Sequence, residues 1–228
     1  MSVTHCYMCE ATATSVEHVP PRCLFPEQKD LPSGVNLRKQ LITVPSCEAH
    51  NTSKSKDDEY LLYALLMNIS NNPTASNHFS SKIVRAIQRS PAVIKKFTEK
   101  QIPVRVEDTQ TGKIHETVAL QVNRKRVETA LAMIGRALYF HHFKKGWRGS
   151  VSAYPNFLLC LTEANARELN EPVEKMAALA EEFFLNQPRY GENQDVFSYQ
   201  VAAGQAPAET IMLLRFYEGS RVTLLFRK

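Results

Sequence analysis

The sequence of 228 residues predicts an α+β fold in which a metal-stapled N-terminal segment precedes helices and antiparallel hairpins. Two pairs of potential metal ligands lie within the first 51 positions, Cys6-x-x-Cys9 and Cys47-x-x-His50. Downstream, stretches with apolar residues every three or four positions alternate with stretches of period two that flank turn residues. Helices in alternation with antiparallel hairpins are typical of the α+β class.

Composition is that of an ordinary globular protein, with 43% hydrophobic and 22% charged residues. No apolar run approaches the roughly 20 residues that span a bilayer, and the N-terminus lacks the pattern of a secretion signal. Five cysteines in such a chain indicate a reducing compartment, where cysteine pairs bind metal more often than they form disulfides. We therefore expect a cytoplasmic protein that does not associate with membranes.

The first 50 residues are rich in turn-forming residues and offer only two short extended stretches, near 14–19 and 40–44. Such a segment buries little apolar surface, so a bound metal is expected to contribute much of its folding energy. Ser55-x-x-Asp58 then reads as a capping box for a helix of about four turns, which Asn71-Asn72-Pro73 ends.

Further along the chain, periodicity and turn residues predict the remaining elements in order. These are a helical stretch over 76–100 interrupted at Ser90-Pro91, a hairpin of 102–107 and 114–122, a helix over 124–143, a buried strand over 156–161, a helix over 163–185 containing Pro172, a strand over 196–201, and a closing hairpin of 210–217 and 221–226. We divide the chain into a metal-bound domain (1–75), a basic helical segment with a hairpin (76–125), and a C-terminal α+β region of unknown role (126–228).

The two Cys/His pairs predict one tetrahedral zinc site. Two intervening residues let each pair fold back so that both donor atoms point at one ion. Cys6, Cys9, Cys47 and His50 give a closed Cys₃His set, which is structural because it leaves no open position. His5 competes for the histidine position, and the alternative is a group of buried thiols beside an incidental histidine. Two further cysteines lack a partner at ligand spacing and are interpreted as simple buried thiols, Cys23 and Cys160.

A second, catalytic centre is predicted beside the first. Asn51 directly follows the last zinc ligand, and Glu17-His18 lies between the two pairs. A carboxylate and an amide oxygen suit Mg²⁺ or Mn²⁺, and an imidazole can take a proton from an attacking water. The alternative is that Glu17 and His18 are plain hydrogen-bonding partners in the fold.

Together these residues resemble the HNH, or His-Me finger, endonucleases with a ββα-metal core, in the zinc-stapled branch typified by recombination endonuclease VII. Glu17-His18-Val-Pro-Pro21 resembles the acid-His-x-x-Pro strand of that family, and Asn51-Thr-Ser-Lys54 resembles its Asn-x-x-Lys helix start. The resemblance implies that His18 is the general base, that Glu17 and Asn51 bind the catalytic Mg²⁺ or Mn²⁺, and that Lys54 contacts phosphate. It covers residues 5 to about 70, under a third of the chain.

The chain departs from the family pattern at three places. His50 replaces the usual fourth cysteine, and Glu17 stands where aspartate is commoner. No histidine occupies the third motif position on the helix, which leaves Asp57, Asp58 or no residue in that role.

Basic residues gather in the middle of the chain, as expected of a protein that binds a polyanion. Residues 82–148 hold 15 Lys and Arg against 5 Asp and Glu, a local charge of +10 in a chain of net charge +5. The last of them, Lys144, Lys145 and Arg148, flank the single Trp147 and are candidates for nucleic-acid contact. The alternative is that Trp147 and its aromatic neighbours close the end of a helix.

By this resemblance the chain is expected to be a metal-dependent HNH endonuclease that hydrolyses nucleic-acid phosphodiester bonds, those of DNA foremost. The alternative is a catalytically inactive, zinc-stapled nucleic-acid-binding or adaptor module. The two differ in whether Glu17, His18 and Asn51 converge on an open cleft. A homodimer is a further candidate assembly.

Overall fold

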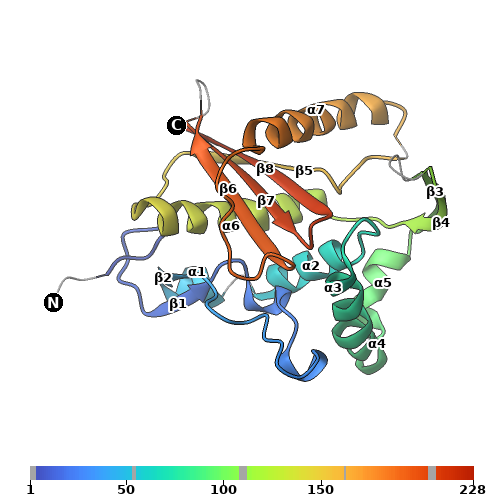
Figure 1. Ribbon diagram of the computed structural model, residues 1–228, viewed down its shortest axis with the longest axis horizontal. Helices are drawn as coiled ribbons and strands as arrows, with labels where there is room; N and C mark the ends of the chain where they lie inside the picture. Colours follow the sequence, from blue (N-terminus) through green and yellow to red (C-terminus); the bar gives the residue numbers. More distant parts are fainter. Residues whose placement is uncertain (1–3, 53–54, 108–111, 162, 205–208) are drawn as a thin grey trace.

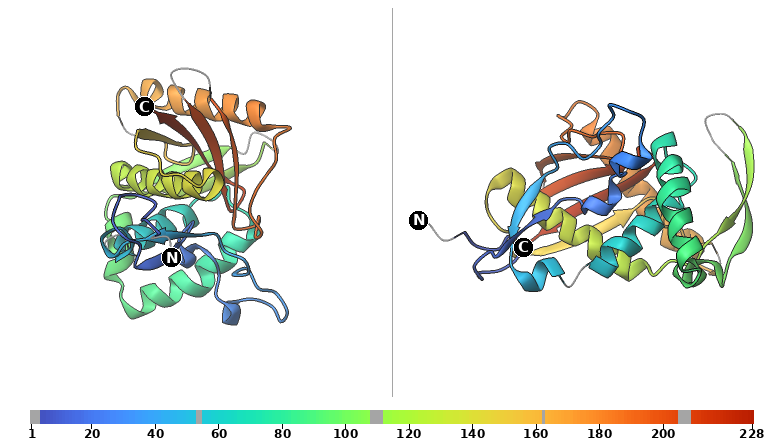
Figure 2. Two further views of the ribbon diagram at one scale, coloured as in Figure 1. Left: turned by 90° about the vertical axis from the view of Figure 1, so that its left-hand side faces the viewer. Right: turned by 90° about the horizontal axis from the view of Figure 1, so that it is seen from below.

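The chain folds into four stacked layers, shown in Figures 1 and 2. The computed structural model describes residues 4–52, 55–107, 112–161, 163–204 and 209–228. Helix α7 (Ala166–Phe184) covers one face of a four-stranded antiparallel sheet, helix α6 (Arg124–Phe143) covers the other, and the N-terminal half packs beneath α6. The predicted α+β class is confirmed. Within these described ranges, no helix has both the length and the apolar character needed to cross a bilayer.

The sheet has the strand order β5 (Ser150–Pro155), β8 (Ser220–Arg227), β7 (Thr210–Phe216) and β6 (Phe197–Ala203). Met212 lies opposite Leu224, and both side chains belong to the face that packs on α6. Gly135 of α6 permits this approach, because a Cβ there would stand 2.5 Å from Leu224 Cδ1. Leu213 lies on the other face and packs against α7.

Helix α6 is the central element of the core and has the bounds that the sequence predicts. The side chain of Asn123 accepts a hydrogen bond from the Arg126 amide (3.0 Å), which caps the first turn. Its apolar residues are buried between the sheet and the N-terminal half, and each such side chain stabilises the fold by about 1.5–3 kcal/mol. They include Val127, Leu131, Ile134 and Leu138.

The N-terminal half begins with strand β1 (Ser15–His18), which pairs antiparallel with β2 (Thr43–Ser46). Both predicted extended stretches therefore form strands, with the second one shifted toward the C-terminus. Two 3₁₀ helices lie between these strands, η1 (Arg22–Leu24) and η2 (Gln28–Asp30). Two α-helices follow the strands, α1 (Glu48–Thr52) and α2 (Ser55–Leu66).

The predicted break at Ser90-Pro91 is confirmed, and it separates α4 (Val84–Arg89) from α5 (Ala92–Thr98). Upstream of α4 the helical path contains α3 (Pro73–His78) and a π-helical turn, η3 (Phe79–Ile83). Strands β3 (Ile102–Glu107) and β4 (Ile114–Ala119) then form the predicted hairpin, which projects from the body (Figure 2).

The predicted buried strand over 156–161 is wrong, because the strand is Ser150–Pro155. The chain turns at Asn156, whose side chain accepts a hydrogen bond from the Arg221 amide (2.9 Å). The apolar run after this turn is partly solvent-facing, with Leu159 44% and Leu161 54% exposed. The prediction was wrong because this apolar run resembles a buried strand, whereas the true strand contains the small polar residues Ser150 and Ser152.

The turn between β7 and β8 docks on the loop that joins α2 to α3. Gly219 is required there, because a Cβ would lie 2.0 Å from the carbonyl oxygen of Ser70. Beside it, Asn68 Nδ2 donates to Ser220 Oγ (2.9 Å), and the Asn72 amide donates to the Tyr217 carbonyl (3.0 Å). The last hairpin of the chain is thereby tied to the N-terminal half.

A buried histidine strengthens this tie. The hydroxyl of Tyr217 donates to the Leu24 carbonyl, so His78 Nδ1, 3.2 Å away, is the donor to that hydroxyl. His78 is fully buried, and its Nε2 has no partner among the described residues.

Burial, with smaller effects from Lys82 and Arg38, lowers the pKa of His78 to about 4, although the charges of Asp30 and Glu27 act in the opposite direction. Between this pH and the ordinary histidine pKa of about 6.5, only the unfolded chain binds the proton. The contribution of His78 to stability is therefore complete above pH ~6.5 and falls as the pH drops toward 4.

We expect the free energy of unfolding of the parent to fall between pH 7 and pH 5 by about 2 kcal/mol more than that of His78→Gln. Urea denaturation at the two pH values measures this difference. His115→Gln on the exposed strand β4 is the control and should follow the parent. Equal pH dependence in all three proteins would contradict the assignment.

Candidate metal centre and adjoining pocket

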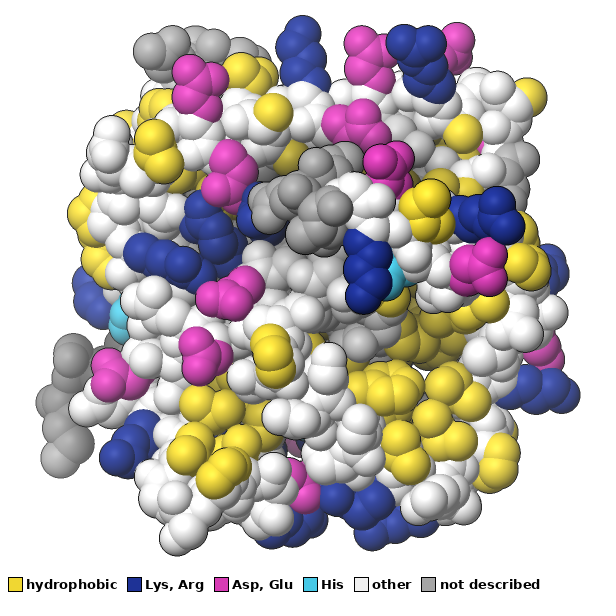
Figure 3. Space-filling model, turned by 45° about the vertical axis from the view of Figure 1, so that its right-hand side comes forward, with side chains coloured by type: hydrophobic (Ala, Val, Ile, Leu, Met, Phe, Trp, Pro, Cys, Tyr) yellow, Lys and Arg dark blue, Asp and Glu magenta, His cyan; other side chains and the backbone are white. Residues whose placement is uncertain are grey.

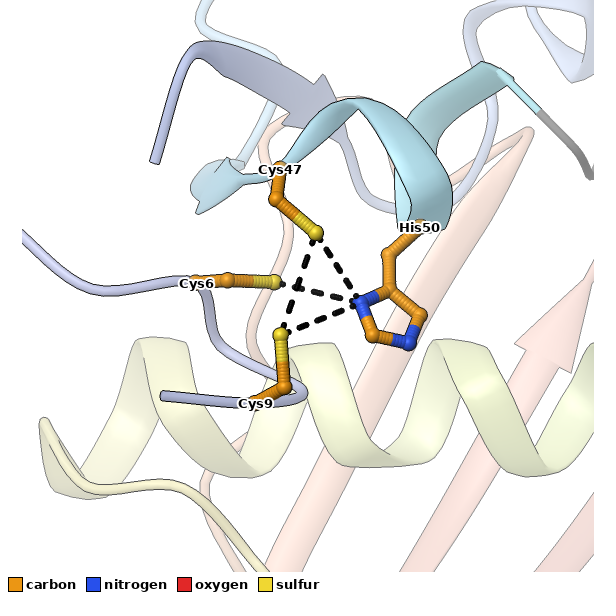
Figure 4. A group of neighbouring side chains, drawn as sticks. All are labelled: Cys6, Cys9, Cys47 and His50. Carbon is orange, nitrogen blue, oxygen red and sulfur yellow. Dashed lines mark hydrogen bonds between the residues drawn. The ribbon is translucent and has the colours of Figure 1, made fainter. Parts of the chain in front are cut away.

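Two turns bring the four predicted zinc ligands together. In the first, the Cys6 amide donates to the Ala11 carbonyl (2.9 Å) and the Met8 amide donates to Cys6 Sγ (3.4 Å). In the second, the His50 amide donates to the Cys47 carbonyl (3.1 Å) as α1 begins. Figure 4 shows the loop of Cys6 and Cys9 facing the start of α1.

The donor atoms of these residues lie within 4.8 Å of one another, close enough to bind one metal ion. His50 Nδ1 is 3.5 Å from Cys6 Sγ, 3.5 Å from Cys9 Sγ and 3.2 Å from Cys47 Sγ, and the last two sulfurs are 3.8 Å apart. A tetrahedral zinc with ordinary bond lengths places such S–N pairs about 3.6 Å apart and S–S pairs about 3.8 Å apart. The donor set therefore fits the group that the spacing predicts.

The thiol of Cys6 is already biased toward the form that binds metal. Burial alone would raise its pKa, but backbone N–H groups of Met8, Cys47 and Cys9, together with His50, lower the pKa of Cys6 to about 6. The thiolate, which is the ligand form, is consequently available near neutral pH.

The competing histidine and the two remaining cysteines lie outside this cluster. The ring of His5 is exposed and its Nδ1 lies 2.8 Å from the Glu10 carbonyl oxygen. Burial raises the pKa of Cys23 to about 11, so this thiol stays protonated. Cys160 is half-buried beside α7, where Asn170 bonds its backbone.

A pocket of about 230 Å³ lies next to the metal cluster, and the three residues predicted to be catalytic all line it. Glu17 and His18 reach it from β1, and Asn51 reaches it from α1. The rest of the wall comes from β1, η1 and α2, namely Val16, Pro21, Arg22, Cys23, Ser55 and Asp58. A single cavity thus brings together a carboxylate, an imidazole and an amide.

Hydrogen bonds orient the amide and the carboxylate. Asn51 Nδ2 donates to Ser15 Oγ (2.9 Å), which donates in turn to the Ser46 carbonyl across the strand pair (3.1 Å). Glu17 is only 4% exposed, and its Oε1 accepts from the Tyr7 hydroxyl (3.3 Å).

Tyr7 connects the metal cluster to the pocket, and sequence reasoning missed it. It sits between Cys6 and Cys9 in the first turn, and its amide donates to the Pro45 carbonyl (2.9 Å). Burial and the charge of Glu17 raise the pKa of Tyr7, so its hydroxyl remains a donor to that carboxylate. The sequence shows a tyrosine directly after the first cysteine of the turn, but only the structure shows that this tyrosine is buried.

The imidazole of His18 is half-buried in the pocket wall. Burial, followed by the charges of Arg22 and Arg38, lowers the pKa of His18 below its ordinary value. The ring is therefore neutral near pH 7 and can accept a proton.

The structure separates the two acids that were open candidates for the third motif position. Asp57 Oδ1 accepts from Arg126 Nε of α6 (2.5 Å), so this carboxylate is directed at another helix. Asp58 lines the pocket with Glu17 and Asn51. Asp58 is therefore the acid that is placed beside the predicted catalytic residues.

The four residues predicted to contact nucleic acid do not share one place in the structure. Lys54 lies outside the described residues, whereas Lys144 and Lys145 are exposed at the C-terminal end of α6. Arg148 pairs with the carboxylate of Glu10 and donates to the Met8 carbonyl (2.9 Å), so it packs on the first metal-binding turn.

Among the residues that the structure describes, the cations of the basic segment do not form one unpaired patch. Figure 3 shows Lys and Arg side chains interspersed with Asp and Glu on the face where β3, β4 and α4 come forward. Several of these cations pair with carboxylates, including Arg85 with Asp30 and Arg105 with Glu116. Trp147 is buried and donates from Nε1 to the Ser150 carbonyl (3.1 Å), as the alternative of a closed helix end expects.

Searches of protein-family models, curated proteins and solved structures found no match to this chain. The resemblance to the HNH endonucleases therefore rests on the residues and on their placement.

We expect the purified parent to contain about one zinc per chain and Cys47→Ser to contain little, since removing one of four ligands opens the site. Elemental analysis measures the metal, and circular dichroism measures the accompanying loss of structure in the N-terminal segment. Cys160→Ser is the matched control and should keep its zinc. A metal-free parent with an intact fold would contradict the metal assignment.

Proposed function

We propose that the chain is a metal-dependent endonuclease of the HNH type, with an N-terminal ββα-metal core. The observation that carries the proposal is the single pocket lined by Glu17, His18 and Asn51 beside the Cys₃His cluster. The order of the elements agrees with it, because the paired strands β1 and β2 are followed at once by α1. In this assignment the cluster binds a structural Zn²⁺, and nucleic acid, foremost DNA, is the substrate.

The catalytic cation in this assignment is Mg²⁺ or Mn²⁺, held by oxygen atoms of Glu17, Asn51 and Asp58. These ions prefer carboxylate and amide oxygens and keep several of their waters, so a small, half-open pocket suits them. When bound, the cation stabilises negative charge on the phosphoryl and leaving oxygens.

The residues of the chain supply the remaining steps. Neutral His18 takes a proton from a water molecule as the water oxygen attacks phosphorus. The bond from phosphorus to the leaving oxygen breaks, and that oxygen is protonated from solvent. Arg22 lies on the pocket wall, where its guanidinium can bind a non-bridging phosphate oxygen.

The placement of Glu17, His18 and Asn51 around one cavity supports an enzyme over an inactive module. An inert scaffold has no need to place an acid, a base and an amide around one pocket. The placement of Arg22 and Asp58 in the same wall adds a cation for phosphate and a further oxygen ligand.

His18→Ala is expected to reduce cleavage of plasmid DNA in Mg²⁺ or Mn²⁺ by about 100-fold or more, because the general base is lost. A gel assay measures nicking, while zinc content and thermal unfolding verify the fold. His115→Ala, at an exposed position on β4, should cut as the parent does. A His18→Ala protein with parental activity would sink the assignment.

The neighbouring acids Asp57 and Asp58 provide a second test with matched substitutions. Asp58→Asn should raise the Mn²⁺ concentration needed for half-maximal cleavage about tenfold, since one charged ligand is removed. Asp57→Asn loses only its partly exposed pair with Arg126, so unfolding becomes easier by under about 1 kcal/mol and the Mn²⁺ requirement stays. Titration of Mn²⁺ in the cleavage assay distinguishes them, and the reverse order would exclude Asp58 as a ligand.

A further inference from the structure

A second pocket of about 280 Å³ adjoins the candidate catalytic pocket. Cys23 and Ser55 line both, so the two cavities meet at the start of α2. One wall of the second pocket is a single face of α2, formed by Lys56, Glu59, Leu62 and Tyr63. The facing wall comes from η3 and α4, with Lys82, Ile83 and Ala86.

Its floor is apolar and its rim is charged. Leu62 and Ile83 are each only 1% exposed, and Tyr63 is nearly as deeply buried, so the floor is rigid core. Lys56 and Glu59 are exposed at the opening. An apolar slot with cations at its edge matches a nucleobase attached to its phosphate.

Two rim residues are held in position by neighbours. Lys82 Nζ donates to the Cys23 carbonyl (3.3 Å), which fixes this cation at the junction of the two pockets. The carboxylate of Glu59 accepts from the Tyr63 hydroxyl (3.4 Å). A carboxylate in such a place can accept a hydrogen bond from the exocyclic amino group of cytosine or adenine.

We propose that this second pocket binds the base of a nucleotide adjoining the scissile phosphate, so that the substrate is a strand with an unpaired nucleotide at that position. The proposal rests on the assigned nuclease function and specifies its substrate. Lys82 binds the phosphate between the two pockets, and the base leaves its stack to lie between the wall of α2 and the wall of α4, against Ala86. A base within a duplex cannot enter, because its edges and faces are covered by its neighbours.

Binding of short fluorescent strands tests the pocket separately from cleavage. The probes are a six-nucleotide single strand of DNA and a strand of the same length with abasic sites, measured by anisotropy with His18→Ala protein so that no cutting intervenes. Loss of a bound base should weaken binding about tenfold. Ala86→Trp, which fills the pocket, should bind both strands equally and with the weaker affinity.

The matched control is Ala92→Trp, an exposed alanine on α5 that lines neither pocket, and it should retain the full preference for the strand with bases. Glu59→Ala supplies a milder variant, which should lose any preference for cytosine over thymine while keeping the abasic penalty. Binding that ignores the bases, or an abasic penalty that survives in Ala86→Trp, overturns the pocket assignment. Absence of cleavage by the parent overturns the nuclease instead, and the two failures are thereby distinguished.

Discussion

The cluster of Cys6, Cys9, Cys47 and His50 is the constraint on which the placement of the pocket depends. Its two turns lie about forty residues apart in a segment with little regular structure, where the short pair of β1 and β2 and the hydrogen bond from the Tyr7 amide to the Pro45 carbonyl also join them. Since Asn51 follows a ligand directly and Tyr7 lies between two others, the metal-binding turns carry groups that reach the pocket wall. The position of the cluster therefore fixes the pocket wall through residues that are next to its ligands in the chain.

Local elements could be predicted from the sequence because each depends on nearby residues. The bounds of α6 follow from its capping Asn123 and from apolar positions at helical spacing, and the break before α5 follows from Pro91. The ligand set was readable for the same reason, since spacing within each Cys/His pair fixes the turn that presents it.

Contacts between distant segments could not be read in this way. The difference between Asp57 and Asp58 depends on Arg126, which becomes a neighbour only when α6 packs on α2. Likewise Arg148 belongs to the basic stretch by sequence but to the metal-binding turn by contact with Glu10. Net charge along the chain therefore overstated the free positive charge on the folded surface, because opposite charges from other segments neutralise part of it.

The hydroxyl of Tyr217 holds the carbonyl of Leu24, and the same short helix η1 supplies Arg22 and Cys23 to the pocket wall. During synthesis, residues 1–66 leave the ribosome long before residue 217 exists. The metal-binding turns can close early and η1 can pack on α2, but the hydrogen bond to the Leu24 carbonyl forms only when the hairpin of β7 and β8 is made. The wall that η1 supplies to the pocket therefore has all of its contacts only after residue 217 has been made.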